Sequence, residues 1–376
     1  MKIVVAIDSF KGSLSSLQAG NAVRESVLRL DSSAEVLVKP LADGGEGTVD
    51  AFASFADAEI ITLTVRGPLL NPVTAKYCIL KDSGTAVIEM AAASGITLIA
   101  GNERNPLKTT TFGVGEMIKD AICRGCKRFI VGIGGSATND GGSGMLTALG
   151  YEFLDKNGNA IPLGAMGLKD LKEIKTEKVI PQLKNCSFSI ACDVTNPLCG
   201  SNGCSAVFGP QKGATEQMVK DMDGWLKEFA QIAKKVSPTA DEFAKGAGAA
   251  GGLGFAFLSF TNAVLKSGIE IVLDEIKLEN EIKDADIVVT GEGRLDGQTV
   301  MGKAPIGVAK LAKKYGKKVI AFSGCVTAEA EVCNEHGIDA FFPILRSVTT
   351  LEDALLPDNA YNNLKATAYQ VFRLLI

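Results

Sequence analysis

The feature of this sequence that most constrains its fold is a succession that recurs along the chain: a short apolar segment, a glycine-rich loop, then a helix-type segment. Residues 2–8 (KIVVAID) lead into a helical pattern that ends near residue 30, and residues 35–40 lead into LADGGEGT and another helix. The same succession returns in ADIVVTGEGRLDGQT, KKVIAFSG and DAFFPI. Such alternation predicts an α/β fold with a doubly wound parallel sheet and crossover helices.

The middle of the chain has a different pattern. Three short strand-type segments follow one another between residues 59 and 90, joined by turns such as Gly67-Pro68, which is typical of antiparallel strands. A chain of 376 residues is also too long for one ordinary core. We therefore expect a discontinuous doubly wound domain, residues 1–65 plus 282–376, with residues 66–281 inserted as a second α/β domain.

Composition and charge exclude several classes of protein. The net charge is −4, and no run of Lys and Arg is long enough for a nucleic-acid-binding stripe, so we expect no nucleic acid partner. The longest apolar stretches are strand-sized, so we expect no membrane span, and MKIVVAIDSF turns polar too early for a signal peptide. Nine cysteines, an odd number, then favour reduced thiols and a cytoplasmic location.

The cysteines do not indicate a redox or metal site. Cys123 and Cys126 form a lone C-x-x-C at the end of a helical pattern, where the helix dipole does not lower a thiol pKa. With His336 as the single histidine and no second cysteine pair, the pattern does not match a zinc site.

The stretch FIVGIGGSATNDGGSGM is the densest of the glycine-rich loops, with six glycines among the thirteen residues from Gly132 to Gly144. A glycine-rich turn between a buried strand and a helix lets backbone N–H groups come close to a phosphate. A tight strand-to-helix connection with a capping Asn or Asp is the alternative. The candidate ligand residues are Gly134, Gly135, Ser136, Thr138, Asn139 and Asp140.

Three further loops have the same composition and the same position after a strand, namely DSFKGS, ADGGEGT and TGEGRLDGQT. Glycines suit phosphates, carboxylates suit Mg²⁺, and a cation such as Lys11 or Arg294 suits a phosphoryl group in transfer. In open α/β sheets, ligands bind beyond the carboxyl ends of the strands. Phosphoryl transfer is the chemistry that uses all three kinds of group.

Lys303 and Asp193 are two further candidate site residues. GQTVMGKA matches G-x-x-x-x-G-K, but Ala304 replaces the Ser or Thr that would bind Mg²⁺, so Lys303 is a candidate phosphate ligand outside a working P-loop. Asp193, in ACDVTNPLCG, follows an apolar segment and is a candidate base for a substrate hydroxyl. A turn residue before Pro197 is the equal alternative for Asp193.

Taken together, six ordered motifs give this chain an end-to-end resemblance to the bacterial glycerate kinase family of the glyoxylate and sugar-acid pathway type. They are DSFKGSLS, PLADGGEGT, GIGGSATNDGG, DVTNPL, GAGAAGGLG and TGEGRLDGQT followed by GKAP. The resemblance implies phosphorylation of D-glycerate by ATP with Mg²⁺. It also implies a flavodoxin-like domain and a domain resembling a restriction-enzyme core, with the active site in the cleft between them.

The resemblance also implies roles for the candidate residues. Asp193 is expected to accept the proton of the attacking hydroxyl, while Lys11 and Arg294 neutralise charge on the transferring group or on the glycerate carboxylate. Asp43, Glu46 and Asp296 are expected to bind Mg²⁺ or to orient other groups. The loop from Gly134 to Asp140 is expected to hold phosphate oxygens. We expect the 2-hydroxyl to be the acceptor, giving 2-phosphoglycerate, with the 3-hydroxyl as the alternative.

A dehydrogenase and a non-catalytic sensor are the two alternatives to a kinase. A dehydrogenase would need G-x-G-x-x-G after the first strand, and DSFKGSLS lacks it. A non-catalytic sensor for a sugar acid or a nucleotide could use the same loops but would not need the carboxylates, all of which are present. Release of ADP that depends on D-glycerate separates an enzyme from a sensor.

Overall fold

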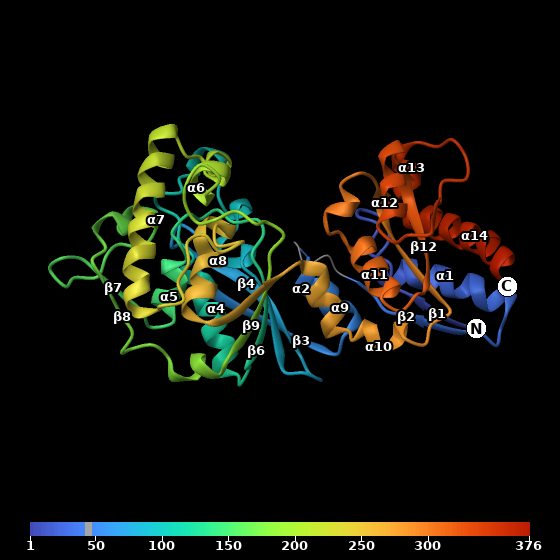
Figure 1. The fold of residues 1–376 in the computed structure, drawn as a ribbon, viewed down its shortest axis with the longest axis horizontal. Coiled ribbons are helices and arrows are strands. Elements are labelled where there is room, and N and C mark those ends of the chain that lie inside the picture. The colour runs from blue at the N-terminus through green and yellow to red at the C-terminus, as the bar shows by residue number, and fades with distance from the viewer. Residues whose placement is uncertain (42–46) are drawn as a thin grey trace. The chain divides into compact units, whose positions relative to one another are not determined.

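The structure is a computed structural model, and it describes residues 1–41 and 47–376. It divides into two compact units, Met1–Gly44 with Ile269–Ile376, and Gly45–Gly268. The first unit is therefore built from both ends of the chain, which Figure 1 shows in blue and in orange to red. Both units combine helices with parallel strands, so the predicted α/β class with two parts is confirmed.

The first unit is organised around a five-stranded sheet of order β13-β12-β11-β1-β2, in which every neighbouring pair is parallel. Counted within this unit alone the order is 2-1-3-4-5, the flavodoxin-like order, whose switch point lies between β1 and β11. The strands are β1 (Lys2–Val5), β2 (Glu35–Val38), β11 (Ile287–Leu295), β12 (Lys318–Val326) and β13 (Ala340–Pro343).

Helices cover this sheet because its central strands are apolar on both faces. Ile3 and Val5 belong to a core with Val27, Leu364 and Phe372, which come from the adjoining helices α1 and α14. Figure 1 shows these two helices side by side. Ser15 and Gln18 form the capping box that starts α1, as their spacing predicts. The helices are α1 (Ser16–Leu30), α9 (Gly268–Glu275), α10 (Leu278–Ile282), α11 (Ala304–Lys313), α12 (Val332–Glu335), α13 (Leu351–Leu355) and α14 (Pro357–Leu375).

The second unit contains a six-stranded mixed sheet of order β10-β9-β6-β5-β4-β3. The three strands expected between residues 59 and 90 pair antiparallel, and the rest of the sheet is parallel. The strands are β3 (Ala58–Arg66), β4 (Pro72–Leu80), β5 (Thr85–Glu89), β6 (Arg128–Gly132), β9 (Ser187–Ala191) and β10 (Asn262–Lys266), with β7 (Glu152–Leu154) and β8 (Glu173–Lys175) as a separate pair.

Aromatic side chains form much of the core of this unit. Phe129 stacks on Phe188 with ring centroids 4.7 Å apart, and Phe257 lies 5.6 Å beyond Phe188. The helices are α2 (Thr48–Phe55), α3 (Ala91–Ser94), α4 (Phe112–Cys123), α5 (Ser143–Ala148), α6 (Cys204–Phe208), α7 (Glu216–Val236) and α8 (Ala249–Phe260). Among the helices of the described residues, none combines the length and the apolar composition that crossing a membrane requires.

The limits of the two units differ from the domain limits expected from the sequence, because residues 45–65 and 269–281 each fall in the other unit. β3 pairs along its whole length with β4, which ties it to the second unit. Ile269 packs so closely on α11 that a Cβ atom at Gly307 would lie 2.6 Å from its Cγ1, and Glu279 accepts a hydrogen bond from Tyr315 at 2.7 Å. These contacts join residues 269–281 to the first unit.

Candidate functional site

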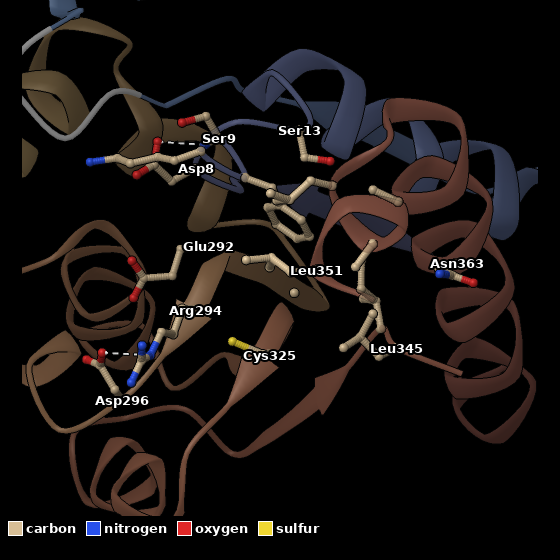
Figure 2. Close-up of a pocket in the computed structure, with 18 of the residues that line it drawn as sticks. Asp8, Ser9, Ser13, Glu292, Arg294, Asp296, Cys325, Leu345, Leu351 and Asn363 are labelled. Carbon is tan, nitrogen blue, oxygen red and sulfur yellow. Dashed lines mark hydrogen bonds and ion pairs between the residues drawn. The ribbon is translucent and has the colours of Figure 1, made fainter. Parts of the chain in front are cut away.

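A cavity of about 370 Å³ opens at the carboxyl ends of β1 and β11 in the first unit. The chain leaves these two strands in opposite directions, so their carboxyl ends leave a crevice where α/β sheets bind ligands. The loop after β1 contributes residues 8–11 and 13, the end of β11 contributes residues 292–294 and 296, and Lys303 lies at the start of α11. Figure 2 shows Asp8, Glu292, Arg294 and Asp296 together on one side of this cavity.

The charged side chains are linked in a network, of which Figure 2 shows the pair formed by Arg294 and Asp296. Arg294 Nε lies 3.3 Å from Asp296 Oδ2, and Lys303 Nζ lies 3.6 Å from Asp296 Oδ1 and 3.8 Å from Glu292 Oε2. Because both carboxylates lie within 4 Å of the same ammonium group, they face one region of the cavity. The side chain of Arg294 is 63% exposed, so its guanidinium is accessible to an anion.

Glu292 is the most deeply buried carboxylate of this network. Thr299 Oγ1 donates to Glu292 Oε1 at 2.8 Å, which fixes the side chain. Burial raises the pKa of Glu292, and the positive charges of Lys303 and Lys11 act in the opposite direction. A cation entering the cavity would therefore stabilise the ionised form of Glu292 further.

The structure brings together the four predicted site residues of the first unit that it describes: Lys11, Arg294, Asp296 and Lys303 all line this cavity. Lys303 does so without a P-loop, as N-cap residue of α11. The predicted Mg²⁺ ligands Asp43 and Glu46 lie outside the described residues.

The predicted glycine-rich loop belongs to the second unit, where it follows β6. Gly134 and Gly135 are exposed and Ser136 is half-buried. A Cβ atom added at Gly134 would meet no other atom within 4 Å, so the backbone is open on that side. This part of the loop can bring its N–H groups close to an anion.

The later residues of the loop, Thr138, Asn139 and Asp140, are buried and held within the protein. Asn139 Nδ2 donates to Ser205 Oγ at 2.8 Å. The carboxylate of Asp140 accepts from the backbone N–H groups of Thr111, Gly142 and Gly144, at 2.8, 3.0 and 3.3 Å. Burial raises the pKa of Asp140. Asn139 and Asp140 therefore support the loop through these contacts, whereas Thr138 Oγ1 and Asn139 Oδ1 are buried with no hydrogen-bond partner among the described residues.

Close packing accounts for the later glycines of the loop, from Gly141 to Gly144, and for Gly251 in GAGAAGGLG. A Cβ atom at Gly251 would lie 2.0 Å from the carbonyl oxygen of Thr138, and one at Gly144 would lie 2.1 Å from Thr110 Oγ1. Gly141 N donates to the Gly251 carbonyl at 2.9 Å. The glycine-rich stretch thus combines an open beginning, at Gly134 and Gly135, with a closely packed end.

Asp193 follows β9, the strand next to β6. Because β6 and β9 are parallel with Gly132 opposite Ala191, Asp193 and the glycine-rich loop lie at the same edge of the sheet. Asp193 is exposed, and its Oδ1 accepts from Gly268 N at 3.3 Å. The second unit therefore places an accessible carboxylate at the edge that carries Gly134 and Gly135.

Sequence reasoning did not single out Asp8, Glu292 or Lys212. Asp8 and Glu292 line the cavity and belong to the motifs DSFKGS and TGEGRLDGQT, so the available signal was the position of Asp8 after one parallel strand and of Glu292 near the end of another. Lys212 had no signal, because GPQKGAT has the composition of an exposed loop. In the structure Lys212 is 2% exposed, and its Nζ donates to the Thr138 carbonyl at 2.7 Å.

Burial lowers the pKa of Lys212 from 10.5 to about 8, although Cys204 and Asp140 nearby favour the charged form. The unfolded chain then binds more protons than the folded protein between these two values, so stability rises with pH through that range. We expect Lys212→Met to remove this gain, which amounts to about 1–2 kcal/mol between about pH 7.5 and about pH 9.5. Urea unfolding of both proteins at the two pH values measures it, and parallel pH dependences would contradict the expectation.

The chain is similar to known proteins over its whole length. The model of the "Glycerate kinase family" matches residues 3–376. A "Glycerate kinase" of Haemophilus influenzae is 46% identical over 100% of this chain and 99% of its own length. A "Glycerate 2-kinase" of Escherichia coli is 47% identical over 97% of this chain and 95% of its own.

A solved structure is similar over the whole fold. The crystal structure described as glycerate kinase 2 from Salmonella typhimurium LT2 has a TM-score of 0.91 and 46% sequence identity, covering 100% of this chain and 98% of that one. Full-length matches of this identity, together with the family model, establish the relationship: the chain is an enzyme of the glycerate kinase family.

Proposed function

We propose that this enzyme transfers the γ-phosphoryl group of ATP to the 2-hydroxyl of D-glycerate, giving 2-phosphoglycerate and ADP. The observation that carries the proposal is the cavity at the switch point of the first unit, which is lined by Lys11, Arg294 and Lys303. Three cations at a strand-end crevice suit phosphate oxygens, and the carboxylates Glu292 and Asp296 beside them suit the Mg²⁺ that accompanies a triphosphate. The name of the Escherichia coli relative, which specifies a 2-kinase, supports the 2-hydroxyl as acceptor.

The cations bind and neutralise the phosphates. Charge spreads over the equatorial oxygens of the transferring group, and positive groups held in place beforehand stabilise that charge without reorganising. Asp296 contacts both Arg294 and Lys303, so it orients these two cations toward the cavity. Lys11 supplies a third positive charge from the loop after β1.

The carboxylates of the cavity fit Mg²⁺. Mg²⁺ is usually bound through one or two carboxylates together with substrate phosphates, rather than by a cage made of protein alone. Glu292 and Asp296 offer such a pair, and the described residues contain no larger group of metal-binding side chains. Glu292 and Asp296 would hold the ion, with Asp43 and Glu46 as further proposed ligands, and bound Mg²⁺ would neutralise phosphate charge.

Asp193 acts as the base. Its carboxylate accepts the proton of the attacking hydroxyl while the oxygen forms a bond to the γ-phosphorus and the bond to the ADP oxygen breaks. The backbone N–H groups at Gly134, Gly135 and Ser136, at the same sheet edge, bind phosphate oxygens. Asn139 and Asp140 keep that loop in shape through their buried hydrogen bonds.

Phosphorus NMR of the product tests the proposal. Incubation with ATP, Mg²⁺ and D-glycerate is expected to give ADP and the resonance of 2-phosphoglycerate. A 3-phosphoglycerate resonance would contradict the choice of hydroxyl. Absence of glycerate-dependent ADP would contradict the whole reaction and would favour the binding-only alternative.

The C-x-x-C pair is not expected to take part. Both thiols are free, Cys123 is exposed, and burial raises the pKa of Cys126, so neither residue has the setting of a reactive pair. We expect the double variant Cys123→Ser, Cys126→Ser to keep kcat within about twofold of the wild-type value. A large loss of kcat at an unchanged melting temperature would instead indicate a redox role.

A further inference from the structure

The cavity of the first unit has two ends of different chemistry (Figure 2). The charged end is described above. The opposite end is formed by the segment after β13 and by α13 and α14, which contribute Leu345, Leu351 and Asn363. The apolar lining is completed by Phe10, Ile344, Ala354, Leu355 and Ala360.

The leucines at this end are unusually exposed for large apolar side chains. Leu351 is 74% exposed, Leu345 41% and Leu355 38%. Single exposed leucines are common, but three around one hollow form an apolar patch, and such patches mark binding sites. A ligand with apolar faces would remove these side chains from water.

The size of the cavity and its two ends suit a ligand of two parts. A volume of about 370 Å³ lies within the range of small-molecule sites, roughly 300–1,000 Å³. The charged end combines cations with carboxylates, which suits a polyphosphate together with Mg²⁺, and the apolar end suits a flat or apolar group joined to the polyphosphate. A nucleoside triphosphate is a ligand in which both parts belong to one molecule.

Asn363 supplies a polar group at the apolar end. The residue is half-buried on α14, and within the part of the chain that the structure describes its amide makes no hydrogen bond. A carboxamide can donate from its NH₂ group and accept at its oxygen at the same time, which matches N7 and the N6 amino group of adenine. Guanine presents two acceptors at that edge, so it can accept from the amide NH₂ but has no donor for the amide oxygen.

We propose that the apolar end of this cavity is the adenine subsite, with the base against Leu351 and Leu355 and its polar edge hydrogen-bonded to Asn363. The proposal rests on the proposed function in one respect, since that function assigns the phosphates of ATP to the charged end. It adds that Asn363 determines the preference for ATP over GTP.

Two variants of the full-length protein test this subsite. We expect Leu351→Gln to weaken ADP binding about tenfold, because it removes apolar contact with the base. We expect Asn363→Leu to lower the ratio of ADP to GDP affinity, which reports the base preference, about ten- to a hundredfold. Calorimetry with ADP, GDP and inorganic tripolyphosphate measures both effects, and tripolyphosphate binding is expected to stay unchanged.

Matched controls come from α14, the helix that carries Asn363. Asn362→Leu and Leu374→Gln change exposed residues of α14 that do not line the cavity, and we expect both to bind ADP as the wild type does. Unchanged ADP binding and base preference in Leu351→Gln and Asn363→Leu would overturn the subsite. Equal weakening of ADP and tripolyphosphate would overturn it too, because the loss would not concern the base.

These readouts are independent of turnover. If the wild type bound ADP with the expected base preference but released no ADP with D-glycerate, the proposed function would fail and the subsite would stand. If turnover were normal while both variants kept wild-type binding, the subsite would fail and the kinase reaction would stand.

Discussion

Replacing Lys11 with methionine is expected to lower kcat/KM for ATP by about 100- to 1,000-fold, the usual cost of losing one preorganised group that stabilises transition-state charge. Lys11 lies in the loop after β1 and lines the cavity with Arg294 and Lys303. Its charge also acts on the pKa of Glu292, which shows that its field reaches the buried part of the site. Steady-state kinetics with varied ATP at saturating D-glycerate measures the effect.

Lys156→Met is the matched control for this variant. Lys156 is an exposed lysine in a turn of the second unit and lies outside the cavity. Its substitution therefore removes one positive charge, as Lys11→Met does, but leaves the lining of the cavity unchanged. We expect Lys156→Met to keep the wild-type kcat/KM. A Lys11→Met enzyme with unchanged kcat/KM would remove Lys11 from the phosphate-binding group.

Replacing Asp193 with asparagine is expected to lower kcat at least about 100-fold, since general base catalysis contributes about 10² to 10⁴. Asparagine keeps the shape of the side chain and an oxygen that can accept from Gly268 N, one of the contacts of Asp193, so the fold is expected to be preserved. KM for D-glycerate is expected to change little, because the lost interaction is the transfer of a proton.

Asp82→Asn is the control for that change. Asp82 is exposed in the turn that leads into β5, at the edge of the sheet opposite to Asp193. Its substitution is expected to leave kcat unchanged. If Asp193→Asn also kept near-normal turnover, the base would be another group, and the role of Asp193 would be that of a turn residue.

The fold was predictable from the sequence where local pattern and tertiary packing coincide. Apolar segments followed by glycine-rich loops became β1, β11 and β12, and their parallel pairing follows from the helices between them. The unit limits were less predictable because single tertiary contacts decide them. No sequence pattern in residues 269–281 indicates that Ile269 packs against Gly307 in α11.

The site was predictable to the extent that it follows strands. Lys11, Arg294 and Asp296 come directly after or at the end of parallel strands, and the structure gathers them in one cavity. Lys212 was not predictable, because a lysine in a glycine-containing turn is normally exposed, whereas here it is buried with its Nζ on the carbonyl of Thr138, 74 residues away in the sequence. Asn363 and the leucines of α13 were missed for a similar reason, since their sequence reads as an amphipathic surface helix.

The glycine-rich stretch after β6 shows both outcomes within one motif. Composition alone left phosphate binding and tight packing as alternatives. The open surface at Gly134 suits the first, while the contact that a side chain at Gly144 would make with Thr110 requires the second. Whether a glycine of this loop is open to a ligand or closely packed therefore depends on which residues, distant in the sequence, lie next to it.

A crystal structure of this enzyme with a non-hydrolysable ATP analogue and D-glycerate tests the central claim most directly. The account predicts the phosphates of the analogue within hydrogen-bonding distance of Lys11 and Arg294, at the carboxyl ends of β1 and β11. An analogue whose phosphates contact neither side chain would contradict it.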